Sequence, residues 1–138
     1  MKGNTVENRS LELLVLKGDF SICKLKSAEG LTFERPFTFF SATDDECSLV
    51  CETAVKPGCE QILESSDGWK GVKICGVLDF SLIGILAGIA QVLRDAGVGI
   101  FVVSTFNTDY VFTRAEQFLE ALEALGRAQY QVITDRDR

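Results

Sequence analysis

The stretch KICGVLDFSLIGILAGIAQVLRDAGVGIFVVSTFNTDYVFT, from Lys73 to Thr113, decides the fold. It predicts a buried strand, a turn that opens a helix, and two more strands joined by a polar hairpin. Two polar junctions, residues 79–84 and 105–109, interrupt the apolar runs. We therefore expect the apolar runs to form a scaffold and the junctions to hold a small ligand, not a reaction centre.

The first half of this stretch predicts a strand followed by a helix. Trp69–Val77 alternates in polarity as a strand does. Ser81 is a candidate N-cap, and Gly97 is a candidate helix stop. Between them, apolar residues recur at helical spacing: Leu82, Leu86, Ile89 and Leu93. We expect this apolar stripe to pack on one face of a sheet.

The remaining C-terminal residues predict two strands, a helix and a last short strand. Ile100–Ser104 is rich in β-branched residues, and Tyr110–Phe112 begins the return strand. Thr113–Glu116 matches a capping box, and Gly126 is expected to end the helix. Tyr130–Ile133 is the last strand. Residues 68–134 thus predict the order β-α-β-β-α-β, an α+β, ferredoxin-like two-layer sandwich.

The N-terminal half, residues 10–62, is strand-rich and less regular. Leu11–Leu16, Phe20–Leu25 and Cys47–Cys51 read as strands. No helix of useful length is evident in this half, so we expect a degenerate version of the C-terminal unit. Glu60–Gly68 is expected to be a short helix and a linker.

Composition narrows the functional classes. The 138 residues carry a net charge of −6, and 46% of them are hydrophobic. Nucleic acids and anionic membranes need a basic face, so neither is an expected partner. The first ten residues lack the apolar core of a signal peptide, and the longest uncharged run is too short to span a bilayer. We expect a cytoplasmic protein.

The cysteines and the missing histidine limit the chemistry further. The chain has five cysteines, no CxxC pair and no histidine. A Cys–His nucleophile is therefore impossible, and a zinc site would need irregularly spaced thiolates alone. Cys23 and Cys75 lie in apolar strand-like runs, which is typical of reduced core thiols. We expect no enzyme activity, no metal and no cofactor.

The first polar junction is Asp79, Phe80, Ser81, Leu82, Ile83 and Gly84. The amides at a helix N-terminus lack intrahelical partners and suit a ligand carboxylate. Ser81 adds a hydroxyl, and Gly84 lets a ligand approach the backbone. The alternative is that Ser81 only caps the helix and Asp79 only stabilises its positive end.

Several of these segments resemble a known family. Gly84–Ala87 and Asp95–Ile100 resemble the first helix and second strand of an ACT domain, the regulatory module that senses amino acids. LDFSLIGILAGIAQVL and VSTFNTDY resemble a narrower group, the small bacterial tandem-ACT proteins related to the CASTOR arginine sensors. PFTFFSATDDECSLVCE resembles the N-terminal half of that group. One departure is Ile83, which stands where many ACT domains have proline.

The resemblance bears on the second junction, Thr105, Phe106, Asn107 and Asp109. In the resembled sensors the matching Thr-Phe pair and aspartate belong to the ligand pocket, so the resemblance implies this role for Thr105, Phe106 and Asp109. An aspartate can also accept the ammonium group of an amino acid. The alternative is a hairpin whose Asn and Asp only favour a tight turn.

Three classes of function follow. The first is a non-catalytic regulatory or sensor module that binds a small amino acid, as a homodimer that signals to an unidentified protein partner. The alternative is a structural or protein-interaction ACT dimer that has lost ligand binding. An enzyme is the least supported class, because no acid–base set or nucleophile motif is evident.

Overall fold

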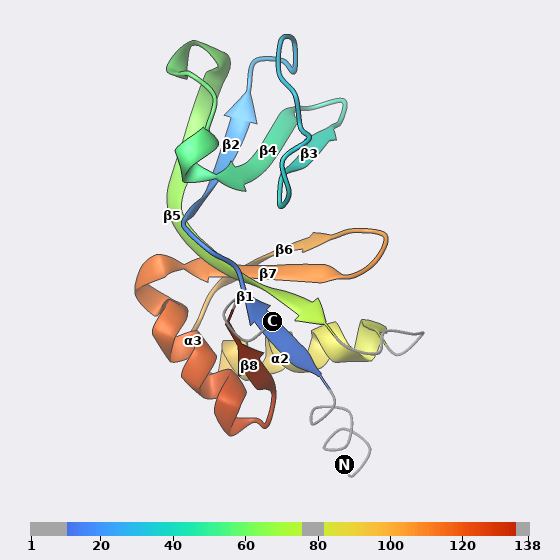
Figure 1. Cartoon of the computed structure of the whole chain (residues 1–138), viewed down its shortest axis with the longest axis vertical. Coiled ribbons are helices and arrows are strands. Elements are labelled where there is room, and N and C mark those ends of the chain that lie inside the picture. Colours follow the sequence, from blue (N-terminus) through green and yellow to red (C-terminus); the bar gives the residue numbers. More distant parts are fainter. Residues whose placement is uncertain (1–10, 76–81, 135–138) are drawn as a thin grey trace. The chain divides into compact units, whose positions relative to one another are not determined.

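The computed structural model describes residues 11–75 and 82–134 of the chain. It divides into two compact units (Figure 1). The inserted unit is Gly18–Trp69, and the C-terminal unit joins Met1–Lys17 to Lys70–Arg138. Strand β5, Ile62–Cys75, begins in the inserted unit and ends in the C-terminal unit. The contacts thus group residues 11–17 with the C-terminal half, whereas the sequence grouped them with residues 10–62.

The C-terminal unit has the predicted β-α-β-β-α-β order, which begins at the end of β5. The elements that follow are α2 (Leu82–Asp95), β6 (Ile100–Ser104), β7 (Asp109–Arg114), α3 (Ala115–Arg127) and β8 (Gln131–Ile133). Residues of both helices and of the strands share one apolar core, which includes Ile89, Val111 and Leu125. The helices therefore form one layer and the sheet the other, which confirms the α+β, ferredoxin-like sandwich.

The N-terminal strand β1, Glu12–Val15, lies inside this sheet. Its Leu13 pairs with Ile74 of β5 in antiparallel register and with Val132 of β8 in parallel register. The sheet order in this unit is therefore β6-β7-β5-β1-β8. Sequence periodicity identified the strand correctly, but it carries no information on which distant strands will pair with it.

The second helix begins and ends differently from the prediction. Thr113 does not cap α3: it lies in β7, is 2% exposed, and donates its hydroxyl to the carbonyl of Arg114. Gly126 does not end the helix either. The chain turns at Gln129 (φ 77°), and the amide of Tyr130 donates to the carbonyl of Leu125. Leu125 and Tyr130 belong to the core, so burial of Tyr130 places the left-handed turn residue at Gln129, three residues after the glycine.

Helix α2 ends where the sequence predicted. Gly97 has a φ of 79°, and the amide of Val98 donates to the carbonyl of Leu93. This is the left-handed helix end that glycine favours because it lacks a Cβ atom.

The inserted unit has the strand order β3-β4-β2-β5. Its strands are β2 (Phe20–Leu25), β3 (Phe39–Ala42), β4 (Cys47–Glu52) and the first part of β5, and its 3₁₀ turns are Thr53–Val55 and Cys59–Gln61. The predicted helix and linker at Glu60–Gly68 is wrong, because residues 62–68 belong to β5. In this unit β5 is an edge strand with mostly exposed side chains. The residues of this part of β5 are therefore polar, which is why the sequence predicted a linker here.

Strand β5 contains a bulge next to Gly68. Phe20 pairs with Trp69 and Ile22 pairs with Ser66, so β5 carries one more residue than β2 across this interval. Gly68 has a φ of 83°, a conformation that glycine adopts without strain. The extra residue shifts the register between β5 and β2, so the residues of β5 before and after the bulge pair with β2 in different registers.

Candidate functional site

The hairpin between β6 and β7 is tied to the end of β5. The amide and the hydroxyl of Thr105 each donate to the carbonyl of Thr108, both at 2.9 Å. The buried hydroxyl of Thr108 donates to the carbonyl of Ile74 at 2.7 Å. Since Ile74 lies near the C-terminal end of β5, this bond places the second predicted junction beside that end of the strand.

Asp109 is the buried charge of this hairpin. It is 5% exposed, opens β7 and pairs with Ser104 of β6. Within residues 11–75 and 82–134, no hydrogen bond or ion pair involves its carboxylate. Its carboxylate oxygens keep some contact with solvent, because no fully buried side-chain oxygen in the described residues lacks a partner. A cationic group that reaches Asp109 would therefore meet a carboxylate that no described residue engages.

The other predicted residues of the second junction lie differently. Thr105 is exposed, and its hydroxyl is used within the hairpin. Phe106 and Asn107 are exposed at the hairpin tip. Asp109 is the one predicted residue of this junction that is buried and whose side chain has no partner among the described residues.

The first predicted junction is described only in part. Asp79, Phe80 and Ser81 lie outside the described residues, so the roles expected for them stay predictions. Leu82 and Ile83 open α2, but their side chains also lie outside the description. Gly84 is exposed, and a Cβ atom added there would meet no atom within 4 Å. The space where a side chain of residue 84 would lie is thus open.

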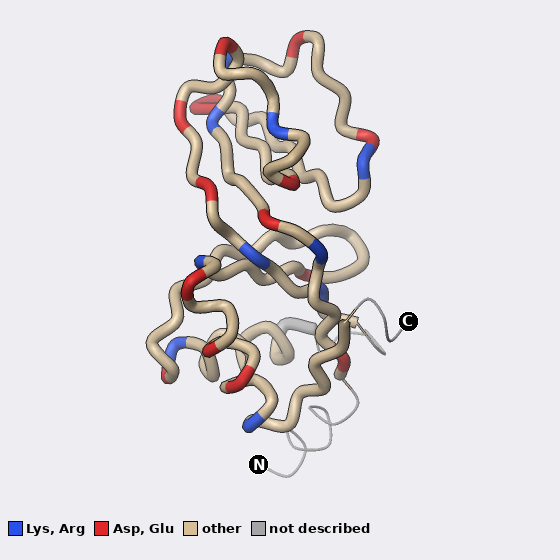
Figure 2. The backbone as a smooth tube through the Cα atoms, turned by 60° about the vertical axis from the view of Figure 1, so that its left-hand side comes forward, with Lys and Arg blue, Asp and Glu red and all other residues tan. Residues whose placement is uncertain are grey.

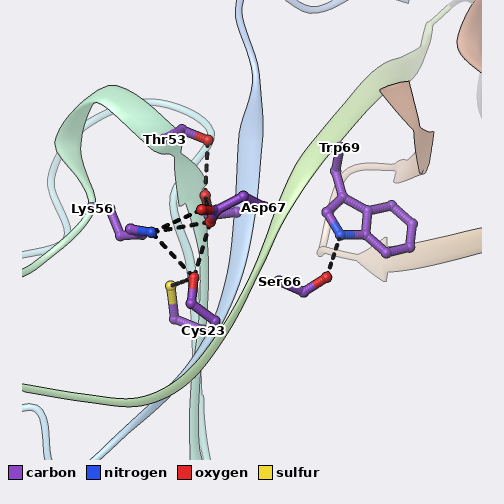
Figure 3. Close-up of polar contacts among 8 residues, drawn as sticks. Cys23, Thr53, Lys56, Ser66, Asp67 and Trp69 are labelled. Atoms are coloured by element: carbon purple, nitrogen blue, oxygen red, sulfur yellow. Dashed lines mark hydrogen bonds and ion pairs between the residues drawn. The ribbon is translucent and has the colours of Figure 1, made fainter. Parts of the chain in front are cut away.

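A second polar cluster, in the inserted unit, was missed by the sequence analysis (Figure 3). Lys56 donates to both carboxylate oxygens of Asp67 at 3.1 Å, and Ser21 donates to one of them at 2.6 Å. Ser65 donates to that same oxygen at 2.9 Å. Because Ser21 gives its only hydroxyl proton to Asp67, Thr53 must be the donor in the 2.8 Å bond between the two hydroxyls.

This cluster is a structural tie and not a reactive site. Hydrogen bonds from Ser21, Lys56 and Ser65 hold the pKa of the Asp67 carboxyl at about 2, below its ordinary 3.8. A carboxylate that stays ionised and fully paired is a poor general acid or base near neutral pH. The cluster instead fixes the 3₁₀ turn and Lys56 to β5. Its members come from three separate segments, and the one usable signal in the sequence is the Asp67-Gly68 pair at the bulge.

The two buried cysteines of the inserted unit are unreactive thiols. Burial is the main cause that raises the pKa of Cys51 to about 11, and it also raises the pKa of Cys23. Both thiols are therefore neutral near pH 7, whereas nucleophiles and metal ligands are thiolates. All five cysteines are free, as expected for Cys23.

The described part of the chain has a mixed distribution of charge. Figure 2 shows acidic and basic residues interspersed along both units. Among residues 11–75 and 82–134, no helix is long and apolar enough to cross a membrane. No group of three or more potential metal ligands occurs in the same residues.

Comparison with known proteins identifies the family. Residues 64–127, from near the start of β5 to the end of α3, match the family described as ACT domain. The rat protein named cytosolic arginine sensor for mTORC1 subunit 1 is 34% identical over 99 residues, which are 68% of this chain and 30% of that protein. The chain is an ACT-domain protein related to these sensors, and its match spans less than a third of their length.

Solved structures agree on the fold. A protein from Agrobacterium tumefaciens superposes with a TM-score of 0.78 and 28% identity over 91% of this chain and 93% of its own. The ligand-free regulatory subunit of aspartate kinase from Thermus thermophilus superposes with a TM-score of 0.54 and 16% identity, over 80% of this chain and 93% of that one. At that identity the second likeness concerns the fold alone.

Proposed function

We propose that this ACT-domain protein is a non-catalytic regulatory module that binds a small amino acid. The observation that supports it most is Asp109, a residue that is 5% exposed and whose carboxylate has no partner among the described residues. It lies in the hairpin that Thr108 ties to the end of β5, the strand that leads into α2. An amino acid carries both an ammonium and a carboxylate group, and the hairpin and the start of α2 offer one site for each.

The proposed binding mode assigns one ligand group to each junction. Asp109 accepts the ammonium group of the ligand, and the free amides at the start of α2 receive its carboxylate. Gly84 has open space where a side chain would lie, which leaves room for this approach. The remaining residues of the two junctions are proposed to line the site: Asp79, Phe80, Ser81, Leu82, Ile83, Thr105, Phe106 and Asn107. The relatives are named as cytosolic sensors of arginine, which supports an amino acid ligand and a cytoplasmic location here.

A thermal-shift screen of the twenty amino acids tests the proposal. A ligand that binds only the folded state raises the melting temperature, by mass action. Asp109→Asn keeps the size of the side chain and removes its charge, so we expect it to abolish the shift while unliganded stability changes little. The matched control is Asp95→Asn, since Asp95 is exposed at the end of α2.

Two results would contradict the proposal. If no amino acid raises the melting temperature at millimolar concentration, the protein is a structural or protein-interaction ACT module instead. If Asp109→Asn lowers unliganded stability as much as it lowers binding, Asp109 is a residue of the turn.

We also propose that the protein acts as a homodimer that passes its signal to another protein by contact. Strand β6 has β7 as its one partner among the described strands, and Ile100–Ser104 contains no charge or proline to protect that edge. Light scattering at micromolar concentration should give twice the monomer mass. Val103→Lys, which places a charge on this edge, should reduce it to the monomer mass; a wild-type monomer would exclude the dimer.

A further inference from the structure

The inserted unit contains a cavity that the proposed amino acid site does not use. It has a volume of about 280 Å³ and lies between β4 and the loop that connects β2 to β3. Leu49 and Cys51 of β4 line one side, and Leu31 and Phe33 of the loop line the other. Every residue around it belongs to Gly18–Trp69, so the cavity lies within one compact unit.

The cavity follows from the absence of a helix at this position. Leu49 and Cys51 are almost fully buried, so this face of the sheet needs a cover. In the described residues a loop covers it, where the C-terminal unit has helices. Phe33 anchors the loop by stacking on Phe40, with ring centroids 4.5 Å apart. A loop presents fewer side chains to a sheet than a helix does, and space remains beneath it.

The lining combines an apolar interior with one cation. Leu31, Leu49 and the neutral thiol of Cys51 supply apolar surface, and Thr38 supplies a hydroxyl. Arg35 is the charged residue of the lining, and no acidic side chain lines the cavity. The Arg35 guanidinium lies 3.7 Å from the Glu52 carboxylate, which is long for an ion pair, and the Arg35 side chain is 60% exposed. Its five N–H groups can therefore also donate to a second carboxylate.

We propose that this cavity binds a small aliphatic carboxylate, with its hydrocarbon chain against Leu49 and Cys51 and its carboxylate on Arg35. Pockets for drug-sized ligands are usually about 300–1,000 Å³, so this one suits a smaller molecule of a few carbon atoms. The site is independent of Asp109, because the two share no residue and belong to different units.

The probe for this site is 4-methylpentanoate, titrated into the full-length ¹⁵N-labelled protein. Binding should shift the amide resonances of the non-proline residues in 30–38 and 49–56 and saturate in the millimolar range. The uncharged analogue 4-methylpentanamide should bind about tenfold more weakly, because charge-assisted hydrogen bonds to a guanidinium are the stronger kind. Shifts at residues 105–109 in place of these, or no saturable shift at millimolar probe, would overturn the proposal.

Two variants should change the affinity in opposite directions. Arg35→Gln removes the cation and should weaken binding about tenfold. Glu52→Gln removes the competing carboxylate and should strengthen it. Arg94→Gln is the matched control, since it removes an exposed arginine from α2 and should change nothing. Unchanged affinity in Arg35→Gln, with the folded spectrum preserved, would refute the role of Arg35.

Two further variants separate this site from the amino acid site and from a folding effect. Val55 lines the cavity but is 38% exposed, so Val55→Phe should fill the space without unfolding the unit and should abolish probe binding. Asp109→Asn should leave probe binding unchanged. Loss of probe binding in Asp109→Asn would mean that the probe occupies the amino acid site, which would overturn the cavity proposal alone.

Discussion

At the scale of single residues, close packing decides which positions tolerate change. Gly71 lies in β5, and a Cβ atom added there would come within 2.5 Å of the ring of Phe112. Phe112 is fully buried in β7, so its ring has little room to move. A glycine that looks like an ordinary flexible position in the sequence is thus a contact point between two strands.

Gly71→Ala should lower the free energy of unfolding by about 1–3 kcal/mol, the usual cost of overpacking a core. The matched control is Gly126→Ala in α3, where an added Cβ atom meets nothing within 4 Å. The control should raise stability by about 0.5–1 kcal/mol, because alanine favours the helix. Urea denaturation of both variants measures the two values. A loss of stability in both variants would mean that the steric argument at Gly71 is wrong.

The Asp67 cluster predicts a pH dependence of stability. The folded state holds the pKa of Asp67 at about 2, against an ordinary 3.8. A lowered pKa stabilises the folded state at pH values above 3.8, and this contribution is lost as the pH falls toward 2. Asp67 is half exposed, so we expect a contribution of less than about 1 kcal/mol after solvent screening.

The measurement compares denaturation of the wild type and of Asp67→Asn between neutral pH and pH 2. The stability difference between the two proteins should be constant above pH 4 and should shrink below it. Glu64→Gln, at an exposed position of the same strand, is the control and should leave the pH profile unchanged. A difference that stays constant down to pH 2 would show that the cluster does not hold the carboxylate in its ionised form.

At the scale of elements, the sequence predicted what depends on local pattern. The helical repeat from Leu82 to Leu93 and the β-branched run at Ile100–Ser104 gave α2 and β6 correctly. The mistakes lie where a distant contact overrides a local signal. Thr113 is drawn into β7 by burial, and the end of α3 is set by Tyr130 in the core. Residues 62–68 are a strand because β2 pairs with them.

The candidate site shows the same division. The local pattern identified the polar hairpin and its aspartate, and the structure adds that Asp109 is buried while Phe106 is exposed. The tie between Thr108 and Ile74 and the cluster around Asp67 join residues more than 30 positions apart. Such contacts follow from strand pairing, which a single sequence does not specify.

At the scale of the whole molecule, the C-terminal unit is closed by a strand from the other end of the chain. β1 lies between β5 and β8, and the inserted unit occupies the sequence between β1 and the end of β5. Closing this sheet brings Leu13 beside Val132. Contacts between residues that are far apart in the sequence require the entropy cost of closing a long loop. We therefore expect β1 to dock late in folding.

Leu13→Ala tests how much β1 contributes to the stability of the C-terminal unit. Leu13 is fully buried and belongs to the core formed with α2 and α3. Truncation of such a side chain costs about 2–5 kcal/mol, which is a large part of the roughly 5–15 kcal/mol that stabilises an ordinary domain. Hydrogen exchange should become faster at the amides of β8 and of the end of β5, which pair with β1. Leu119→Ala, at an exposed position of α3, is the control and should change stability by less than about 0.5 kcal/mol. If Leu13→Ala cost no more than this control, β1 would contribute little to the stability of the C-terminal unit.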